Sequence, residues 1–187
     1  ELWVAVPPST ITFSGTVAVR EAVPGAVNPA GTVVTFTTAD EVVHQATTDA
    51  NGAFSFELAI GTEGTLSLAR DVTPGVDKTL DIFDVIALFN VVSGSVPVAT
   101  VGVPGLIAAD YNKDGSADIF DVIALFNHVA GNAGATAPDY VFIDQAADLG
   151  APNAALVPMP GPVTVGALMA DTSLSMTAIL SGDMQGH

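Results

Sequence analysis

One stretch of twelve residues, from Asp110 to Asp121, has the residue types and the spacing of a calcium loop. Calcium takes about six to eight hard oxygen ligands in a flexible geometry, and side chains at positions 1, 3, 5, 9 and 12 of such a loop wrap around one point. Those positions are Asp110, Asn112, Asp114, Asp118 and Asp121. Position 7 is Ser116, which would add a backbone carbonyl, and the sharp turn at position 6 falls on Gly115. The alternative interpretation is an Asx-rich helix-capping turn without metal.

The residues that follow this loop belong to an internal duplication. The decapeptide Asp-Ile-Phe-Asp-Val-Ile-Ala-Leu-Phe-Asn occurs at 81–90 and again, unchanged, at 118–127. An identical repeat at a fixed offset indicates a duplicated structural unit. Each copy is predicted to be a helix, because its apolar residues recur at i, i+3, i+4 and i+7. These residues are Ile82, Val85, Ile86 and Phe89 in the first copy and Ile119, Val122, Ile123 and Phe126 in the second. Gly94 and Gly131 are predicted to end the helices, which we expect to pack on each other about a local two-fold axis.

The loop before the first decapeptide matches the calcium pattern less closely. Aligning the repeats places candidate ligands at positions 1, 5, 7, 9 and 12, namely Thr73, Asp77, Thr79, Asp81 and Asp84. Asp71 could serve as position 1 only if two residues are inserted, and Lys78 replaces the glycine of position 6. The sequence leaves two interpretations open. Either the loop is irregular and still binds a second calcium ion, which is our expectation, or it has lost the metal.

Two departures from a standard EF-hand point to a family. Position 12 is Asp121 where an EF-hand has Glu, and no helix is predicted before the loop, because Ser95 to Ala109 is rich in Val, Gly and Pro and suggests an extended connection. The order of loop, helix, linker, loop and helix over residues 71–131 resembles the dockerin-type repeat pair. That resemblance implies a cohesin-like partner bound through exposed residues near the end of each loop, which are apolar here (Ile82-Phe83 and Ile119-Phe120).

Residues 1–70 have the composition of β-structure, with Thr and Val in runs separated by turn signals. The expected strands are Thr10–Arg20, Thr32–Thr38, Glu41–Thr47, Ala53–Leu58 and Gly64–Leu68. The run from Thr47 to Phe56, together with Gly15–Val17 and Ala30–Val34, resembles the carboxypeptidase-regulatory-like (CNA-B-like) β-sandwich. Members of that family mostly serve as stalks or spacers.

Residues 132–187 begin with a linker of small residues and return to β-structure. The expected strands are Tyr140–Ile143, Ala155–Val157, Pro162–Met169 and Ser173–Leu180. Because this segment is short for a core of its own, we expect its strands to complete a sheet in the same or a neighbouring subunit. The apolar arm around Trp3 is either a first strand or a donor strand for a neighbour. With its Gly182-Asp183-Met184-Gln185-Gly186 ending, the chain resembles the C-terminal modules of large secreted bacterial surface proteins.

Composition excludes several classes of function. The chain has 20 Asp and Glu against 4 Lys and Arg, a net charge of −16, which disfavours nucleic acid and anionic membranes as partners. It has no cysteine, and its apolar runs are interrupted before they reach the length of a membrane span. None of the three histidines lies near a second one or near a catalytic acid pair, so no enzymatic activity is expected.

The expected fold class is mainly β with a small α part: an Ig-like or CNA-B-like β-sandwich with an inserted dockerin-like pair of calcium loop–helix units. The expected division is 1–70 for the first sandwich strands, 71–131 for the repeat pair and 132–187 for the linker and final strands. The expected function is that of a secreted, calcium-stabilised structural subunit at the cell surface, self-assembling into an extracellular filament or layer through strand exchange. The alternative is a module that docks on a cohesin-like protein.

Overall fold

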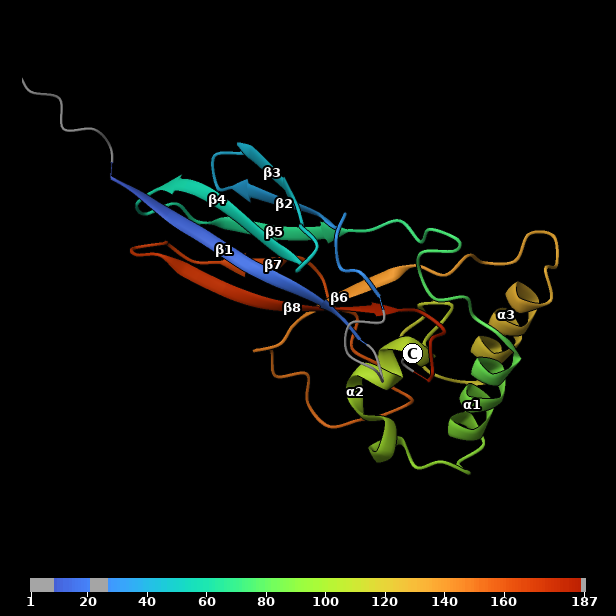
Figure 1. The fold of residues 1–187 in the computed structure, drawn as a ribbon. Coiled ribbons are helices and arrows are strands. Elements are labelled where there is room, and N and C mark those ends of the chain that lie inside the picture. The colour runs from blue at the N-terminus through green and yellow to red at the C-terminus, as the bar shows by residue number, and fades with distance from the viewer. Residues whose placement is uncertain (1–8, 21–26, 186–187) are drawn as a thin grey trace, which may run out of the picture.

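The computed structural model describes residues 9–20 and 27–185. Within these ranges the chain forms two four-stranded sheets and three helices, with the helices gathered at one end of the sheets (Figure 1). In chain order the elements are β1 (Thr10–Val19), β2 (Val33–Thr38), β3 (Val43–Thr47), β4 (Ala53–Ala59), β5 (Gly64–Ala69), α1 (Ile82–Val92), α2 (Val98–Ala109), α3 (Ile119–Val129), β6 (Tyr140–Asp144), β7 (Val163–Val165) and β8 (Thr172–Leu180).

The two sheets pack face to face through large apolar side chains. One sheet has the strand order β4-β1-β8-β6 and the other β3-β2-β5-β7. Phe13 of the first sheet meets Phe36 of the second edge-on, with ring centroids 5.5 Å apart, and Phe56 lies 6.2 Å from Phe36. Inward-facing residues alternate with outward-facing ones along β1, β2 and β4, as a sandwich requires. The prediction of a mainly β protein with a small α part is confirmed.

The late strand β8 lies inside its own chain's sheet. It pairs in parallel with β1, where Phe13 is opposite Thr172, and antiparallel with β6, where Tyr140 is opposite Leu180. The expected strand at residues 155–157 is wrong, because that segment forms no ladder. The expected strand from Pro162 to Met169 shortens to β7.

Helices α1 and α3 form where the decapeptide predicts them. Each begins with a capping box, in which Asp81 or Asp118 is the N-cap and the Asp three residues later completes the box. Each is followed by a glycine with positive φ, Gly94 at 78° and Gly131 at 68°.

Helix α2 contradicts the expected extended connection. It is two short helical pieces joined at Gly102, whose φ of 66° and ψ of −178° are not helical. Pro104 follows at the start of the second piece, where its missing N–H costs no helical hydrogen bond. Gly and Pro therefore divide this segment without preventing helix formation.

The helices bury a different face from the expected stripe. Val85, Leu88 and Val91 of α1 are buried, whereas Ile82, Ile86 and Phe89 remain about half exposed. Helix α3 behaves in the same way, with Val122 and Leu125 buried. The two helices do contact each other, as expected for the repeats.

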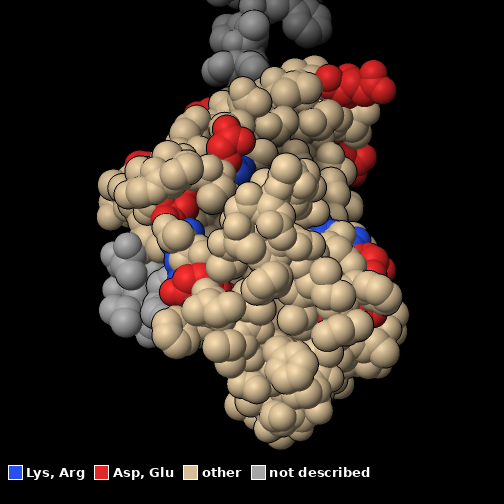
Figure 2. All heavy atoms as spheres, turned by 90° about the vertical axis from the view of Figure 1, so that its right-hand side faces the viewer, with Lys and Arg blue, Asp and Glu red and all other residues tan. Residues whose placement is uncertain are grey.

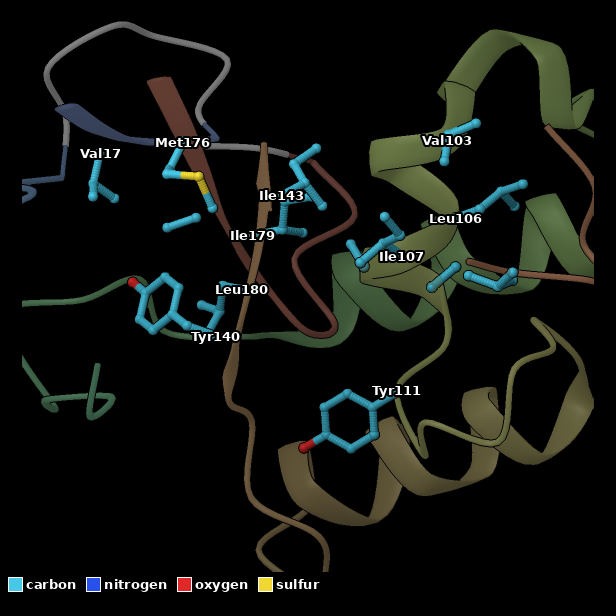
Figure 3. Packing of buried hydrophobic residues seen from close by; sticks show 14 of the residues in the cluster. Val17, Val103, Leu106, Ile107, Tyr111, Tyr140, Ile143, Met176, Ile179 and Leu180 are labelled. Carbon is cyan, nitrogen blue, oxygen red and sulfur yellow. The ribbon is translucent and has the colours of Figure 1, made fainter. Parts of the chain in front are cut away.

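A single apolar core runs from the sandwich into the helical part. Met176 and Ile179 of β8 belong to the same cluster of buried residues as Leu106 and Ile107 of α2 (Figure 3). Tyr111, which is 1% exposed, extends that cluster to the loop before α3. The sheets therefore hold both ends of the repeat region in place.

Candidate metal centre

The second predicted calcium loop connects α2 to α3. Helix α2 ends at Ala109 with Asp110 as its C-cap, and α3 starts directly after Asp118, so the segment is a complete helix–loop–helix. The expectation that no helix precedes the loop is wrong. Lys113 and Gly115 have φ values of 61° and 88°, which turn the chain sharply between its two ends.

Backbone hydrogen bonds orient the two carboxylates that close this loop. Asp110 accepts hydrogen bonds from the N–H groups of Asp114 and Gly115, each at 3.0 Å. Asp121 accepts from the N–H of Asn112 at 2.9 Å and from that of Asp118 at 2.8 Å. Hydrogen bonds from the backbone of the loop thus fix the side chains at its first and last positions.

The same two carboxylates are buried, and their negative charges act on each other. Asp110 is 4% exposed and Asp121 is 0% exposed. Burial and the negative charges of Asp110 and Asp114 together raise the pKa of Asp121 to about 6, against the lowering effect of its backbone hydrogen bonds. Burial also raises the pKa of Asp110. Within the described residues neither carboxylate forms an ion pair with Lys, Arg or His. A bound cation would remove this electrostatic cost.

The remaining predicted ligands of this loop are more accessible. Asn112 and Asp114 are exposed and are linked by a hydrogen bond of 3.0 Å between their side chains. The side chain of Asp114 also accepts from the hydroxyl of Ser116 at 2.7 Å. Asp118 caps α3 by accepting from the N–H of Phe120 at 2.7 Å. These contacts are compatible with both interpretations of the sequence, the calcium loop and the capping turn without metal.

Over residues 9–20 and 27–185, no three His, Asp or Glu side chains have the arrangement of a metal site. A calcium loop also draws on amide and carbonyl oxygens. The donor set is chemically suitable for calcium, because two buried carboxylates lie beside an amide, a third carboxylate and a backbone carbonyl. Calcium would be held by Asp110, Asn112, Asp114, Ser116 and Asp121, with Asp118 as the sixth candidate.

Residues 154–157, for which the sequence predicted no contact with this loop, lie against it. The N–H of Ala117 donates to the carbonyl of Ala154 at 2.7 Å, and the N–H of Val157 donates to the carbonyl of Gly115 at 2.8 Å. Residues 154–157 therefore support the loop, which explains why the predicted strand there is absent from both sheets. No sequence pattern marks this pairing.

In the first copy, the buried carboxylate of Asp77 pairs with an arginine. Arg70 Nη2 lies 2.6 Å from Asp77 Oδ1, and the side chains are 6% and 1% exposed. Tyr140 donates its hydroxyl to the same oxygen at 3.0 Å, and the N–H of Thr73 donates to Oδ2 at 2.6 Å. Burial alone would raise the pKa of Asp77, but the hydrogen bonds from Thr73, Arg70 and Tyr140 outweigh it and leave the pKa lowered.

The second buried carboxylate of the first copy, Asp84, faces a lysine. Lys78 Nζ lies 3.6 Å from Asp84 Oδ1 and 2.7 Å from Asp183 Oδ1. The N–H of Met184 donates to Asp84 at 3.1 Å. The other predicted ligands, Asp71, Thr73, Thr79 and Asp81, are exposed. From the sequence, Lys78 is recognisable only as a residue in place of the loop glycine, and no pattern predicts the roles of Arg70, Tyr140 and Asp183.

Two features outside the loops are candidates for binding. The first, which we name the helix face, consists of large apolar side chains on α1 and α3 that are between 44% and 64% exposed: Ile82, Phe83, Ile86, Phe89, Ile119, Phe120, Ile123 and Phe126. Figure 2 looks onto this end of the molecule and shows a broad surface without charged side chains, with Asp and Glu at its margins.

The second feature, which we name the edge cavity, has a volume of about 300 Å³ and lies between the two sheets. Its walls include Leu66 and Leu68 of β5, and Val141 and Phe142 of β6. Met159, which is 62% exposed, lies at its rim. Asp110 also lines it, so the cavity reaches the calcium loop.

Comparison with known proteins gives no family: no family model matches the chain, and no curated protein matches it. The dockerin-like and CNA-B-like resemblances therefore stay predictions. Among the described residues, none of the helices has the length and apolar character needed to cross a membrane.

Proposed function

We propose that this chain is a secreted, calcium-stabilised structural subunit that assembles with copies of itself into an extracellular filament or layer. The observation that carries this proposal is the edge cavity, because it combines apolar walls with open strand edges. Calcium in the Asp110–Asp121 loop would act as a fixed support in a chain that has no cysteine for disulfides.

The open edges lie on both sides of the cavity. Strand β7 pairs only with Gly64–Leu66 of β5, and within the described residues no strand pairs with Ser67–Ala69 on that side. Across the cavity, β6 is the edge strand of the other sheet. Unpaired backbone groups beside apolar walls are what an added strand from another chain requires.

The donor in this proposal is the arm from Leu2 to Val6 of a neighbouring copy, which lies outside the described residues. Its five residues are all apolar and include Trp3. One arm and one cavity per chain make a head-to-tail contact, and such a contact produces filaments when its rotation does not close a ring.

Electron microscopy and light scattering test the proposal, using purified protein in calcium. Met159→Glu introduces a charge at the rim of the cavity, and Met169→Glu is the matched control, because Met169 is 68% exposed and does not line the cavity. We expect the wild type and Met169→Glu to form polymers and Met159→Glu to remain monomeric. Monomeric wild type in both calcium and chelator would refute self-assembly.

The helix face supports a second candidate, docking on a separate cohesin-like protein. Eight large, exposed apolar side chains on two helices that contact each other exceed the scattered apolar residues of an ordinary surface. Phe83 and Phe120 are the most exposed of them. Phe83→Asp with Phe120→Asp should abolish binding to cohesin-like domains in biolayer interferometry, whereas Leu156→Asp, at a position 72% exposed, should not. Failure of wild type to bind any domain of such a panel counts against docking.

A further inference from the structure

We propose that the first repeat holds no calcium because Lys78 supplies, within the chain, the positive charge that calcium supplies in the second repeat. This inference goes beyond the proposed function and does not depend on assembly. It rests on a comparison of the charges that surround the equivalent buried carboxylates of the two repeats.

The last position of each loop has the same local structure. Asp84 and Asp121 each complete a capping box, and each accepts a hydrogen bond from the N–H three residues earlier, at 3.0 and 2.8 Å. Both are buried, at 1% and 0% exposure. The decapeptide and the capping geometry around Asp84 and Asp121 are therefore matched, whereas the loop residues that face the two carboxylates differ.

The difference arises at position 6 of the loop. The second repeat has Gly115 there, and the first has Lys78. The Lys78 ammonium lies 3.6 Å from Asp84 Oδ1, on the side of the carboxylate that is not used by the Asp81 N–H. A lysine at this position thus places a cation against position 12, where a calcium ion would otherwise be needed.

Among the described residues, Asp84 is not the only acid that contacts Lys78. Asp183 is the second carboxylate that contacts its ammonium, at 2.7 Å, and Arg20 donates to the Asp183 backbone carbonyl at 2.8 Å. Asp84 and Asp183 thus share the Lys78 ammonium, and the charge of Asp183 also acts on Arg20. Asp77, the remaining buried acid of this repeat, pairs with Arg70. A divalent cation placed here would meet the Lys78 ammonium and would have to displace it.

Calcium counting on the full chain tests the inference. Native mass spectrometry and calorimetry should give one calcium per wild-type chain and none for Asp110→Ala with Asp121→Ala. A wild type with no calcium would refute the Asp110–Asp121 site and, with it, the comparison on which this inference rests. Calcium that remains bound to the double variant would overturn the inference.

A charge-removal series supplies a second readout. In the Asp110→Ala, Asp121→Ala background, Lys78→Met leaves buried carboxylates without their cation, so the thermal midpoint in chelator should fall by roughly 10 °C. Millimolar calcium should recover part of that fall. Lys113→Met is the matched control, because Lys113 pairs with the exposed Asp139, and its midpoint should not respond to calcium. A Lys78→Met midpoint equal to that of its background would overturn the proposal.

Discussion

At the scale of single residues, the buried aspartates of this chain are of two kinds, which differ in the groups that lie beside the carboxylate. Asp77 and Asp84 are buried beside basic side chains, whereas Asp110 and Asp121 are buried beside each other. A buried charge without a partner is costly, and a metal ion is one of the few ways to remove that cost. The asymmetry makes the second loop the place where calcium should have its largest effect.

We expect Asp110→Ala combined with Asp121→Ala to abolish calcium binding at the second loop, because the variant removes both buried carboxylates. Calorimetry measures the result as a loss of one site per chain. Asp40→Ala is the control, since Asp40 is exposed in a turn far along the chain from the loop. Unchanged stoichiometry in the double variant would contradict the assignment of the ligands.

Asp77 should make stability depend on acid pH. Its pKa is lowered in the folded state, so its stabilising effect is present above the ordinary aspartate pKa and is lost as pH falls through the lowered value. At neutral pH, Asp77→Asn should cost about 3 kcal/mol, because Arg70 is left buried without its partner. Denaturant titrations between pH 7 and pH 2 should show the wild type and the variant converging at low pH. A constant difference would show that the ion pair is not the cause.

The spacing of the second loop could be recognised from sequence because its ligands are local, within twelve residues. The ion pairs of the first repeat could not. Asp183 lies 105 residues from Lys78, and Tyr140 lies 63 residues from Asp77, so only the folded chain brings them together. The one local signal of these ion pairs was Lys78, which stands at the loop position where the calcium pattern has glycine.

At the scale of elements, most of the strands and the repeat helices followed from local patterns, whereas the strand expected at 155–157 and two features of the helices did not. Helix α2 was missed because Gly102 and Pro104 have the composition of a linker. The buried face of α1 was misjudged because nearly every residue of that helix is apolar. Periodicity cannot select a face when Val85, Leu88 and Val91 compete with Ile82, Ile86 and Phe89. Contacts with α3 and with C-terminal residues such as Met184 decide it.

Two glycines with the same conformation should separate loop geometry from general stability. Gly115 and Gly131 both have positive φ, at 88° and 68°. Replacing either by alanine should lower the free energy of unfolding by about 1 kcal/mol, because a Cβ disfavours this region. Only Gly115→Ala should also weaken calcium binding, by about tenfold if a similar strain falls on the bound loop. Equal calcium affinity in both variants, measured by calorimetry, would argue against a turn required for the metal.

At the scale of the whole molecule, the continuous core should couple calcium to the sandwich. Tyr111 of the loop and Met176 of β8 belong to one buried cluster, so the repeat region and the sheets should unfold together. At about 100 times the dissociation constant, calcium adds about 2.7 kcal/mol, which should raise the thermal midpoint by roughly 5–10 °C. Calorimetry and near-ultraviolet circular dichroism should report one transition. Separate transitions, of which only one moves with calcium, would contradict the coupling.

The central position of β8 has a consequence for the order of events in folding. Strand β1 is synthesised long before β8, because its partner segment in β8 comes about 160 positions later, as the contact of Thr12 with Asp171 illustrates at a separation of 159. Such long-range pairing makes folding slow, because a large loop must close before the contacts form. A nascent chain would leave the edge of β1 that pairs with β8 open until β8 emerged. We therefore expect chaperones that bind extended chains to assist its folding after synthesis.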